Sequence, residues 1–294
     1  MEDARRGASR WRSCGRSRIV CDGSRRGEVV IAGKIHPSAV IDARAEVDSS
    51  VEIGPGAVIG PNVRIGADTV IGPYAVIESN TTIGKRNHIF QFASLGTPPQ
   101  DLKFKGEPSM LEIGDDNQIF EFTTLHRGTE GGGMVTRIGN QAFLMNYVHI
   151  AHDCQVGDHV VVANSSGIAG HCVIEEWAIV EGFCGVHQFC HIGAHAILAA
   201  GSKVAQDVPP YSMVAGGERA RLVGVNLVGL QRRNFSEETI AALKSAMRTL
   251  FYSNLIRAEA IEKVLKEQAQ FPEVRRLIDF IQKSQRGVVG RERE

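Results

Sequence analysis

The sequence predicts a mainly β protein, a left-handed parallel β-helix of hexapeptide repeats followed by a small C-terminal α-helical domain. An aliphatic residue recurs at every sixth position from Ile35 to Val204, with interruptions only near 95–112 and 125–137. The following position is often glycine and the fifth is usually small. A period of six suits neither an α-helix nor a two-sided strand, and it is typical of a parallel β-helix. After Pro210 the apolar spacing changes to three or four residues, which indicates helices.

Three hexads form one triangular coil in this architecture, so residues 18 apart stack at a strand spacing of about 4.8 Å. The aliphatic side chains fill the interior of the prism, and the small fifth residues lie where space is most limited. Such hexads are characteristic of the left-handed form. The aliphatic positions are Ile35, Ile41, Val47, Ile53, Ile59, Ile65, Ile71, Ile77, Ile83, Ile89, Ile113, Ile119, Ile138, Leu144, Ile150, Val156, Val162, Ile168, Ile174, Val180, Val186, Ile192, Leu198 and Val204.

The chain divides into three segments. Residues 1–30 are rich in arginine and serine and have no apolar core, so we predict a disordered extension. A transit peptide, or upstream sequence that is not part of the mature protein, are the alternatives for this segment. Residues 31–210 form the β-helix, with loops near 95–112 and 128–137, and residues 211–294 form the helical domain.

Local signals support the C-terminal helices. The Pro-Pro pair at 209–210 ends the repeats, because proline cannot donate to a parallel ladder. Ser236 is a suitable N-cap for a helix whose apolar residues follow at three- or four-residue spacing. We expect a second helix over 258–268, a third from Pro272, and a short helix or turn over 226–232. These elements would cover the open end of the β-helix.

The composition limits the classes of function. Lys plus Arg and Asp plus Glu number 33 each, so the net charge of zero gives no support to nucleic acid binding. No apolar run approaches the roughly 18 residues that span a bilayer. Four cysteines fall on the inward fifth position, where we expect them to act as small apolar side chains rather than in disulfides or zinc sites. They are Cys154, Cys172, Cys184 and Cys190.

Both loops leave the prism beside one face. Counting hexads through the interruptions places them on the same side as the hexads that start at Ile150, Ile168 and Val186. Gly170 stacks directly over His152, one coil away. This face carries His126, His149, His152, His171 and His187, whereas we expect His88, His159, His191 and His195 to be surface residues. The sequence therefore predicts a cleft of imidazoles flanked by two loops, which is a candidate site.

Three uses of this cleft are open from the residues alone. His152 could take a proton from a hydroxyl as a general base, with Asp153 orienting its ring and the Gly170 amide stabilising an oxyanion. His126, His149 and His152 could instead ligate zinc, although the additional histidines and the long polar loops fit that use poorly. A purely structural role leaves the concentration of histidines unexplained.

Motifs outside the aliphatic register resemble those of the acyl-carrier-protein–UDP-N-acetylglucosamine O-acyltransferases. They occur in the order of that family and cover about residues 34–286. Hexapeptides alone indicate only a superfamily of acyl- and acetyltransferases, whereas these motifs are far more specific. The matching runs are Q-D-L-K-F-K-G-E-P (100–108), L-H-R-G-T (125–129), G-G-G-M (131–134), H-I-A-H-D-C (149–154), V-H-Q-F-C (186–190), V-A-Q-D-V-P-P-Y (204–211) and G-V-N-L-V-G-L-Q-R-R-N-F (224–235).

The resemblance implies transfer of a 3-hydroxyacyl group from acyl carrier protein to the 3-hydroxyl of UDP-N-acetylglucosamine, the first step of lipid A synthesis, with no cofactor or metal. It implies His152 as the general base, Asp153 as its partner and Gly170 as the oxyanion donor. It also implies a cytoplasmic homotrimer with clefts between subunits. The substrate-binding residues that it implies are Asp101, Lys103, His126, His149, His171, His187, Gln188, Asn226 and Arg232.

The chain departs from the family at two positions of interest. Val228 replaces an acidic residue that is common beside the uridine site. Ala200 lies in the region that limits acyl-chain length, where glycine is frequent, so we expect a preference for a somewhat shorter chain. A basic strip of Lys203, Arg219 and Arg221 is expected to dock the acidic acyl carrier protein.

Four other functions compete with this interpretation. The related N-acyltransferase usually carries a uridine-binding domain before the repeats, for which residues 1–30 are too short. An acetyl-CoA-dependent acetyltransferase would not need the loop at 100–108. A zinc-dependent enzyme like the trimeric carbonic anhydrases would contain metal, and a non-catalytic scaffold would tolerate replacement of His152.

Overall fold

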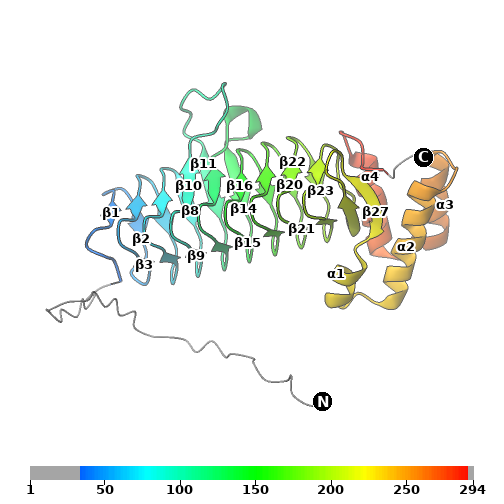
Figure 1. Ribbon diagram of the computed structural model, residues 1–294, viewed down its shortest axis with the longest axis horizontal. Coiled ribbons are helices and arrows are strands. Elements are labelled where there is room, and N and C mark those ends of the chain that lie inside the picture. The colour runs from blue at the N-terminus through cyan, green and yellow to red at the C-terminus, as the bar shows by residue number, and fades with distance from the viewer. Residues whose placement is uncertain (1–33, 291–294) are drawn as a thin grey trace, which may run out of the picture.

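The computed structural model describes residues 34–290, which form a triangular prism closed at one end by helices (Figure 1). The extension expected over 1–30 lies outside the described residues. Most hexads give a two-residue strand that ends on its inward aliphatic residue and is followed by a corner turn, and the strands beside the two loops are longer. Strands pair in parallel with a register of 18, as in Val58↔Val76. The predicted left-handed parallel β-helix with a small C-terminal helical part is confirmed.

The corners depend on a repeated backbone conformation. The fourth residue of most hexads has a left-handed φ close to +60°, for example 58° at Asn62 and Asp68. Asn and Asp adopt this conformation more readily than other residues with side chains, but here aromatic residues and histidines also do so. Because every coil repeats the turn, side chains at equivalent corners lie directly above one another.

Three sheets form the faces of the prism. Sheet I contains, in order, β1 (Val40–Ile41), β4 (Val58–Ile59), β7 (Val76–Ile77), β10 (Ser94–Thr97), β13 (Thr124–His126), β16 (His149–Ile150), β19 (Gly167–Ile168), β22 (Gly185–Val186) and β25 (Lys203–Val204). Sheet II contains β2 (Glu46–Val47), β5 (Arg64–Ile65), β8 (Thr81–Ile83), β11 (Met110–Ile113), β14 (Val135–Ile138), β17 (Gln155–Val156), β20 (Val173–Ile174) and β23 (His191–Ile192). Sheet III contains β3 (Glu52–Ile53), β6 (Val70–Ile71), β9 (His88–Ile89), β12 (Gln118–Ile119), β15 (Phe143–Leu144), β18 (Val161–Val162), β21 (Ile179–Val180), β24 (Ile197–Leu198), β26 (Ser212–Ala215) and β27 (Arg221–Val225).

The interior of the prism is a continuous apolar ladder. From Ile53 onward the aliphatic residues of successive coils are buried, as Ile59 and Ile77 illustrate. Burial of one such side chain contributes about 1.5–3 kcal/mol relative to exposure, so the stack is the main source of stability. The inward cysteines are buried, free thiols, as expected; they are Cys154, Cys172, Cys184 and Cys190.

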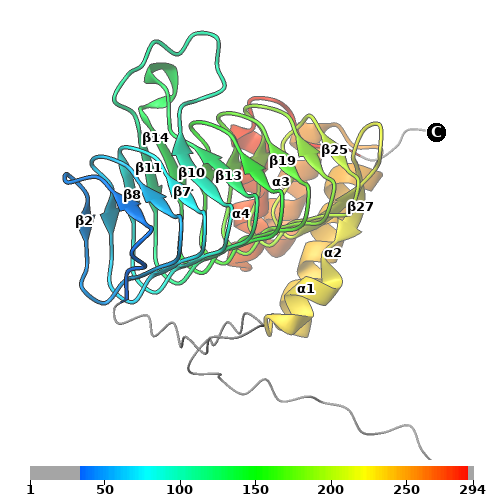
Figure 2. The same cartoon turned by 60° about the vertical axis from the view of Figure 1, so that its left-hand side comes forward.

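The two loops project side by side from the edge between sheets I and II (Figures 1 and 2). One connects β10 to β11, and the other connects β13 to β14 through the short 3₁₀ helix η1 (Glu130–Gly132). The Gly128 N–H donates to the Met110 carbonyl (3.1 Å), and the Met110 N–H donates to the Met134 carbonyl (2.8 Å). Both loops therefore leave beside the face that carries β16, β19 and β22, as the hexad count predicts.

The C-terminal segment adds strands before its helices. β26 continues sheet III beside β24 and β27 pairs antiparallel with β26. The sequence analysis did not anticipate these strands, because the last coil is shortened and pairs Ile197 with Met213, a separation of 16 rather than 18. The helices are α1 (Leu227–Arg232), α2 (Glu237–Tyr252), α3 (Arg257–Gln268) and α4 (Pro272–Lys283).

The helices lie at the end of the prism and partly cover it (Figure 2). Ser236 caps α2 by accepting a hydrogen bond from the Thr239 N–H (3.1 Å). His159, His191 and His195 are half-buried, so the expectation of surface positions was wrong for these three, whereas His88 is exposed. His159 stacks on Trp177, and C-terminal residues pack against the other two. Between residues 34 and 290, no helix is both long and apolar enough to cross a bilayer.

Candidate active site

The centre of the site is one corner between sheets I and II. His152 and Asp153 follow β16, and Gly170 and His171 follow β19 one coil further along. Asp153 and His171 each occupy the left-handed corner position, with φ of 61°. The repeat therefore brings these four residues together without any contribution from a distant part of the chain.

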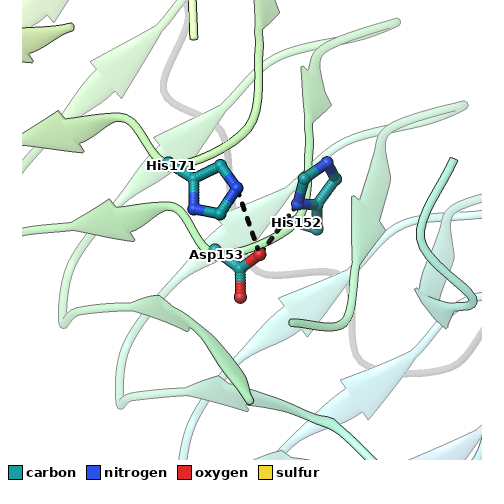
Figure 3. Close-up of side chains that lie close together, drawn as sticks. All are labelled: His152, Asp153 and His171. Carbon is teal, nitrogen blue, oxygen red and sulfur yellow. Dashed lines mark hydrogen bonds and ion pairs between the residues drawn. The ribbon is translucent and has the colours of Figure 1, made fainter. Parts of the chain in front are cut away.

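His152 and Asp153 form a buried hydrogen-bonded pair. The His152 Nδ1 lies 2.8 Å from the Asp153 Oδ2, and the Asp153 side chain is only 1% exposed. Because an ionised carboxylate only accepts hydrogen bonds, Nδ1 carries a proton and Nε2 presents its lone pair. The His171 Nε2 lies 3.7 Å from the same oxygen (Figure 3). The arrangement suits His152 for proton abstraction.

The loop with η1 holds the carboxylate from the other side. The Thr129 N–H donates to the Asp153 Oδ1 (2.8 Å), and the Thr129 hydroxyl donates to Oδ2 (2.6 Å). The Thr136 hydroxyl accepts a hydrogen bond from the Asp153 N–H (2.7 Å). A Cβ atom at Gly132 would lie 1.9 Å from the Asp153 Cγ, so only glycine allows this loop to cover the carboxylate.

Gly170 presents a backbone donor above His152. A Cβ atom at this position would lie 2.6 Å from the His152 Cε1 and 2.8 Å from Nε2, so the ring requires glycine there. The third position of a hexad does not donate to the backbone ladder, which is why Pro55, Pro61 and Pro73 are tolerated at it. The Gly170 N–H accordingly has no hydrogen-bond acceptor among residues 34–290. It is free to donate to an oxyanion.

Two further imidazoles lie beside the pair and are neutral near pH 7. Burial lowers the pKa of His126 to about 4, and the neighbouring His149 and His152 reinforce the shift. Burial also lowers the pKa of His149. The two rings meet edge to face at 5.0 Å, and the Thr124 hydroxyl lies 2.8 Å from the His149 Nδ1. As neutral rings they can serve as hydrogen-bonding groups without adding charge.

A cleft of about 580 Å³ extends from this corner along sheet I. Residues of β16, β19, β22 and β25 line it, so it spans about 15 Å at the usual strand spacing. Gly167 and Gly185 face it, and a Cβ atom added at either would have no neighbour within 4 Å, which leaves a smooth floor. His187 and Lys203 lie at the end nearer the helices. An elongated, largely apolar floor suits a flexible chain.

Of the remaining predicted residues, His187 lines the cleft, and Gln100 brings the first loop to it beside Asp101. Asp101 and Lys103 lie in the first loop, and their charges act on His171, whose pKa is lowered mainly by burial. His187 and Gln188 are exposed at the corner after β22. The structure thus places the first loop and four coils around one cleft, while the second loop contacts Asp153 through Thr129.

Asn226 and Arg232 lie on another edge of the same chain. The Asn226 side chain caps α1 by accepting from the Gly229 N–H (3.1 Å), and it donates to the His195 carbonyl (2.9 Å). His195 occupies the corner after sheet II, whereas His152 occupies the corner after sheet I. Figures 1 and 2 show α1 on the lower side of the prism and the two loops on the upper side. One chain does not bring these two residues to the cleft.

The donor set fits an acid–base pair better than a metal. Donor atoms of His152, Asp153 and His171 lie within 4.8 Å of one another, close enough to consider a shared ion. The carboxylate already accepts three hydrogen bonds, two from Thr129 and one from His152. These bonds account for both carboxylate oxygens, so no further partner is needed to explain the burial of the charge.

The sequence analysis missed three residues that shape the site. Thr129 and Gly132 belong to motifs that it noted, but only the structure shows that they contact Asp153. Arg286 gave no signal, because it follows α4 and returns to the prism. Its guanidinium donates to the His187 Nδ1 (3.3 Å) and to the Ala205 carbonyl (3.2 Å).

Known proteins share both parts of the chain. A family model described as Udp N-acetylglucosamine O-acyltransferase, domain 2, matches residues 207–289, and the bacterial transferase hexapeptide (six repeats) matches 33–67 and 136–170. The chain is 49% identical over 259 residues to the acyl-[acyl-carrier-protein]–UDP-N-acetylglucosamine O-acyltransferase of Janthinobacterium sp. (strain Marseille), covering 87% of this chain and 98% of that relative.

Solved structures agree with this relationship. The UDP-N-acetylglucosamine O-acyltransferase of Moraxella catarrhalis RH4 superposes with a TM-score of 0.84 at 46% identity, covering 87% of this chain and 99% of that one. The UDP-N-acetylglucosamine acyltransferase of Francisella novicida gives a TM-score of 0.83 at 39% identity, covering 87% and 94%. The chain therefore belongs to the acyl-carrier-protein–UDP-N-acetylglucosamine O-acyltransferase family.

Proposed function

We propose that this protein transfers a 3-hydroxyacyl group from acyl carrier protein to the 3-hydroxyl of UDP-N-acetylglucosamine, the first step of lipid A synthesis. The observation that carries the proposal is the His152–Asp153 pair beneath the free Gly170 amide, at one end of an elongated cleft. Family membership over nearly the full length of the relatives supports the choice of substrates. No cofactor is required.

The geometry supplies each step of acyl transfer. The His152 Nε2 takes the proton of the sugar hydroxyl as its oxygen attacks the thioester carbonyl. The tetrahedral oxyanion accepts a hydrogen bond from the Gly170 N–H. The intermediate collapses, the carbon–sulfur bond breaks, and the His152 imidazolium returns its proton to the departing thiolate. Asp153 stabilises the imidazolium between these two transfers.

Polar residues around the cleft would hold the substrates. Asp101 and Lys103 of the first loop, whose charges act on His171, would bind polar groups of the sugar nucleotide or of the acyl chain together with that histidine. The other binding residues that we propose are His126, His149, His187 and Gln188 beside the cleft, and Asn226 and Arg232 for the uridine diphosphate. Val228 is exposed on α1, so it offers an apolar surface where relatives often have a carboxylate.

We further propose a cytoplasmic homotrimer in which a neighbouring subunit supplies Asn226 and Arg232 to each cleft. A row of stacked aromatic rings along the edge between sheets III and I supports association. The ring centroids are 4.9–5.7 Å apart, and the side chains are 44–59% exposed. Such an apolar row is typical of an interaction surface. Its members are Tyr74, Phe92, Phe122 and Tyr147.

The acidic carrier protein would dock near the helical end. Lys203 lines the cleft there, Arg219 precedes β27, and Arg221 is the first residue of that strand. The Arg219 guanidinium donates to the Gln206 side chain (2.7 Å), which places its charge beside the last coil. These three cations would attract an acidic partner to the mouth of the cleft.

A direct assay tests the proposal. Purified protein is incubated with UDP-N-acetylglucosamine and a series of 3-hydroxyacyl carrier-protein thioesters, and O-acylated product is measured by mass spectrometry. We expect product in the presence of a chelator, and a loss of about 10³-fold in His152→Ala. His36→Ala is the matched control, because His36 lies in the first coil, far from the cleft, with its Nδ1 2.8 Å from the Ser38 hydroxyl. Absence of product with every donor would refute the assignment.

A further inference from the structure

Thr129 lies where a helix cap is expected but does not act as one. It is the N-cap residue of η1, yet its side chain makes no capping hydrogen bond. The hydroxyl instead donates to the Asp153 Oδ2 at 2.6 Å, and the backbone N–H donates to Oδ1 at 2.8 Å. Thr129 is 5% exposed. A side chain that gives up a local hydrogen bond for a distant carboxylate points to a role at that carboxylate.

The hydrogen bonds at Oδ2 leave it no room for another donor. A carboxylate oxygen offers about two lone-pair positions. The His152 Nδ1–H uses one of them at 2.8 Å, and the Thr129 hydroxyl uses the other. The His171 Nε2 is the next nearest nitrogen, at 3.7 Å, and it is held outside hydrogen-bond distance. Figure 3 shows both imidazoles directed at this one oxygen.

Bulk solvent does not reach this carboxylate. Gly132 crosses so closely that a Cβ atom there would lie 1.9 Å from the Asp153 Cγ, and the Asp153 side chain is 1% exposed. The partners of Oδ2 are therefore decided by three groups of the protein itself, namely Thr129, His152 and His171.

We propose that Thr129 is a positioning residue that reserves Asp153 for His152 by occupying the lone pair that His171 would otherwise use. This inference rests on the proposed function, in which His152 is the base. Two imidazoles lie near one carboxylate. The Thr129 hydroxyl determines that Asp153 orients His152 and that His171 stays free to bind substrate.

The proposal predicts how the site changes without the hydroxyl. In Thr129→Val the backbone N–H still donates to Oδ1, but one lone pair of Oδ2 becomes vacant. A small movement of His171 then forms a second imidazole–carboxylate bond. The charge of Asp153 already opposes the lowering of the pKa of His171 by burial, so a closer contact raises that pKa. His152 shares its partner and loses catalytic power.

Nuclear magnetic resonance tests this selection without any substrate. Protein labelled at histidine with ¹⁵N is titrated, and His171 is assigned by its absence in His171→Phe, whose ring keeps the stacking on Phe189 (4.5 Å). We expect the pKa of His171 to rise by at least half a unit in Thr129→Val, and to be unchanged in Thr129→Ser, which restores the hydroxyl. If valine prevents folding, Thr129→Ala serves in its place.

Kinetics in two backgrounds provide the second readout. We expect Thr129→Val to lower kcat about tenfold in the native background but less than threefold in the His171→Phe background, where no competitor is present. Thr69→Val is the matched control, since Thr69 is buried and its hydroxyl donates to the Gly84 carbonyl (3.0 Å) far from the cleft. It should reduce stability alone.

The outcomes separate this inference from the proposed function. An unchanged pKa of His171 together with equal losses in both backgrounds would overturn the selecting role and leave Thr129 as a structural residue. A wild-type protein without acyltransferase activity would refute the proposed function, while the titration would still decide whether Thr129 controls the access of His171 to Asp153.

Discussion

Replacement of Gly170 by alanine tests whether the oxyanion amide and the base depend on one close contact. The added Cβ atom would lie 2.6 Å from the His152 Cε1 and 2.8 Å from Nε2, whereas ordinary contact begins at 3.4 Å. The backbone at Gly170 does not adopt the left-handed conformation that excludes alanine. The change therefore acts on the imidazole rather than on the coil.

The size of the effect follows from this displacement. The ring has to move by nearly 1 Å or to turn away from Asp153, and a misplacement of about 1 Å costs on the order of 10²-fold in rate. Turning would also break the 2.8 Å bond between Nδ1 and Oδ2. The Gly170 N–H itself remains, so the loss measures the position of the base and not the removal of the oxyanion donor. We expect kcat to fall about 10²-fold with little change in KM.

Steady-state kinetics and thermal unfolding together check this expectation. Gly217→Ala is the control, because a Cβ atom there has no neighbour within 4 Å and the backbone tolerates alanine. Gly170→Ala should unfold within a few degrees of the wild type while losing activity. Full activity in Gly170→Ala would show that the ring of His152 has more freedom than the structure indicates, and the assignment of its base position would fail.

Two further predictions concern contacts made by C-terminal residues. Burial raises the pKa of Glu175, but hydrogen bonds from His191 and a backbone amide and the charge of Arg276 outweigh it and lower this pKa to about 2. The stability that ionised Glu175 contributes is therefore present above pH ~4.5 and is lost as the pH falls toward 2. Arg276→Met should lower the free energy of unfolding by about 1–2 kcal/mol at pH 7 and by less at pH 2.5, as measured by denaturant unfolding. Arg286→Met should raise KM for the acyl carrier-protein substrate three- to tenfold, because it removes a cation and the donor to His187. A fall in kcat with unchanged KM would contradict this second expectation.

The repeat explains why so much of the fold could be predicted. Each hexad adds the same local conformation, so one period determines the strands, the corners and the 18-residue register together. Hexad counting also placed the two loops, because their insertions do not disturb the order of the coils that follow. The last coil could not be predicted, because it pairs Ile197 with Met213 and so departs from the 18-residue register. Strand pairing there depends on packing below the helices rather than on a repeating pattern.

The site could be predicted where its residues share a corner, and not where other segments reach it. His152, Gly170 and His171 follow from stacking alone. The contacts of Thr129 and Arg286 depend on how an irregular loop and the chain end fold back, which no period encodes. The ion pair of Arg276 with Glu175 (2.7 Å) likewise joins residues about a hundred positions apart. His191, whose Nε2 lies 2.8 Å from Glu175, therefore looked like a surface residue in the sequence.

The corner itself explains how a simple repeat can hold an acid–base site rigidly. Every turn directs a third and a fourth residue outward from the prism, and stacking places those of the next coil directly above them. At this corner the third positions are His152 and Gly170, and the fourth positions are Asp153 and His171. A base, its carboxylate, an oxyanion donor and a second imidazole thus arise from one turn repeated twice. The apolar ladder inside the prism fixes the spacing of the coils, so the stability of the core also holds the residues of the site in position.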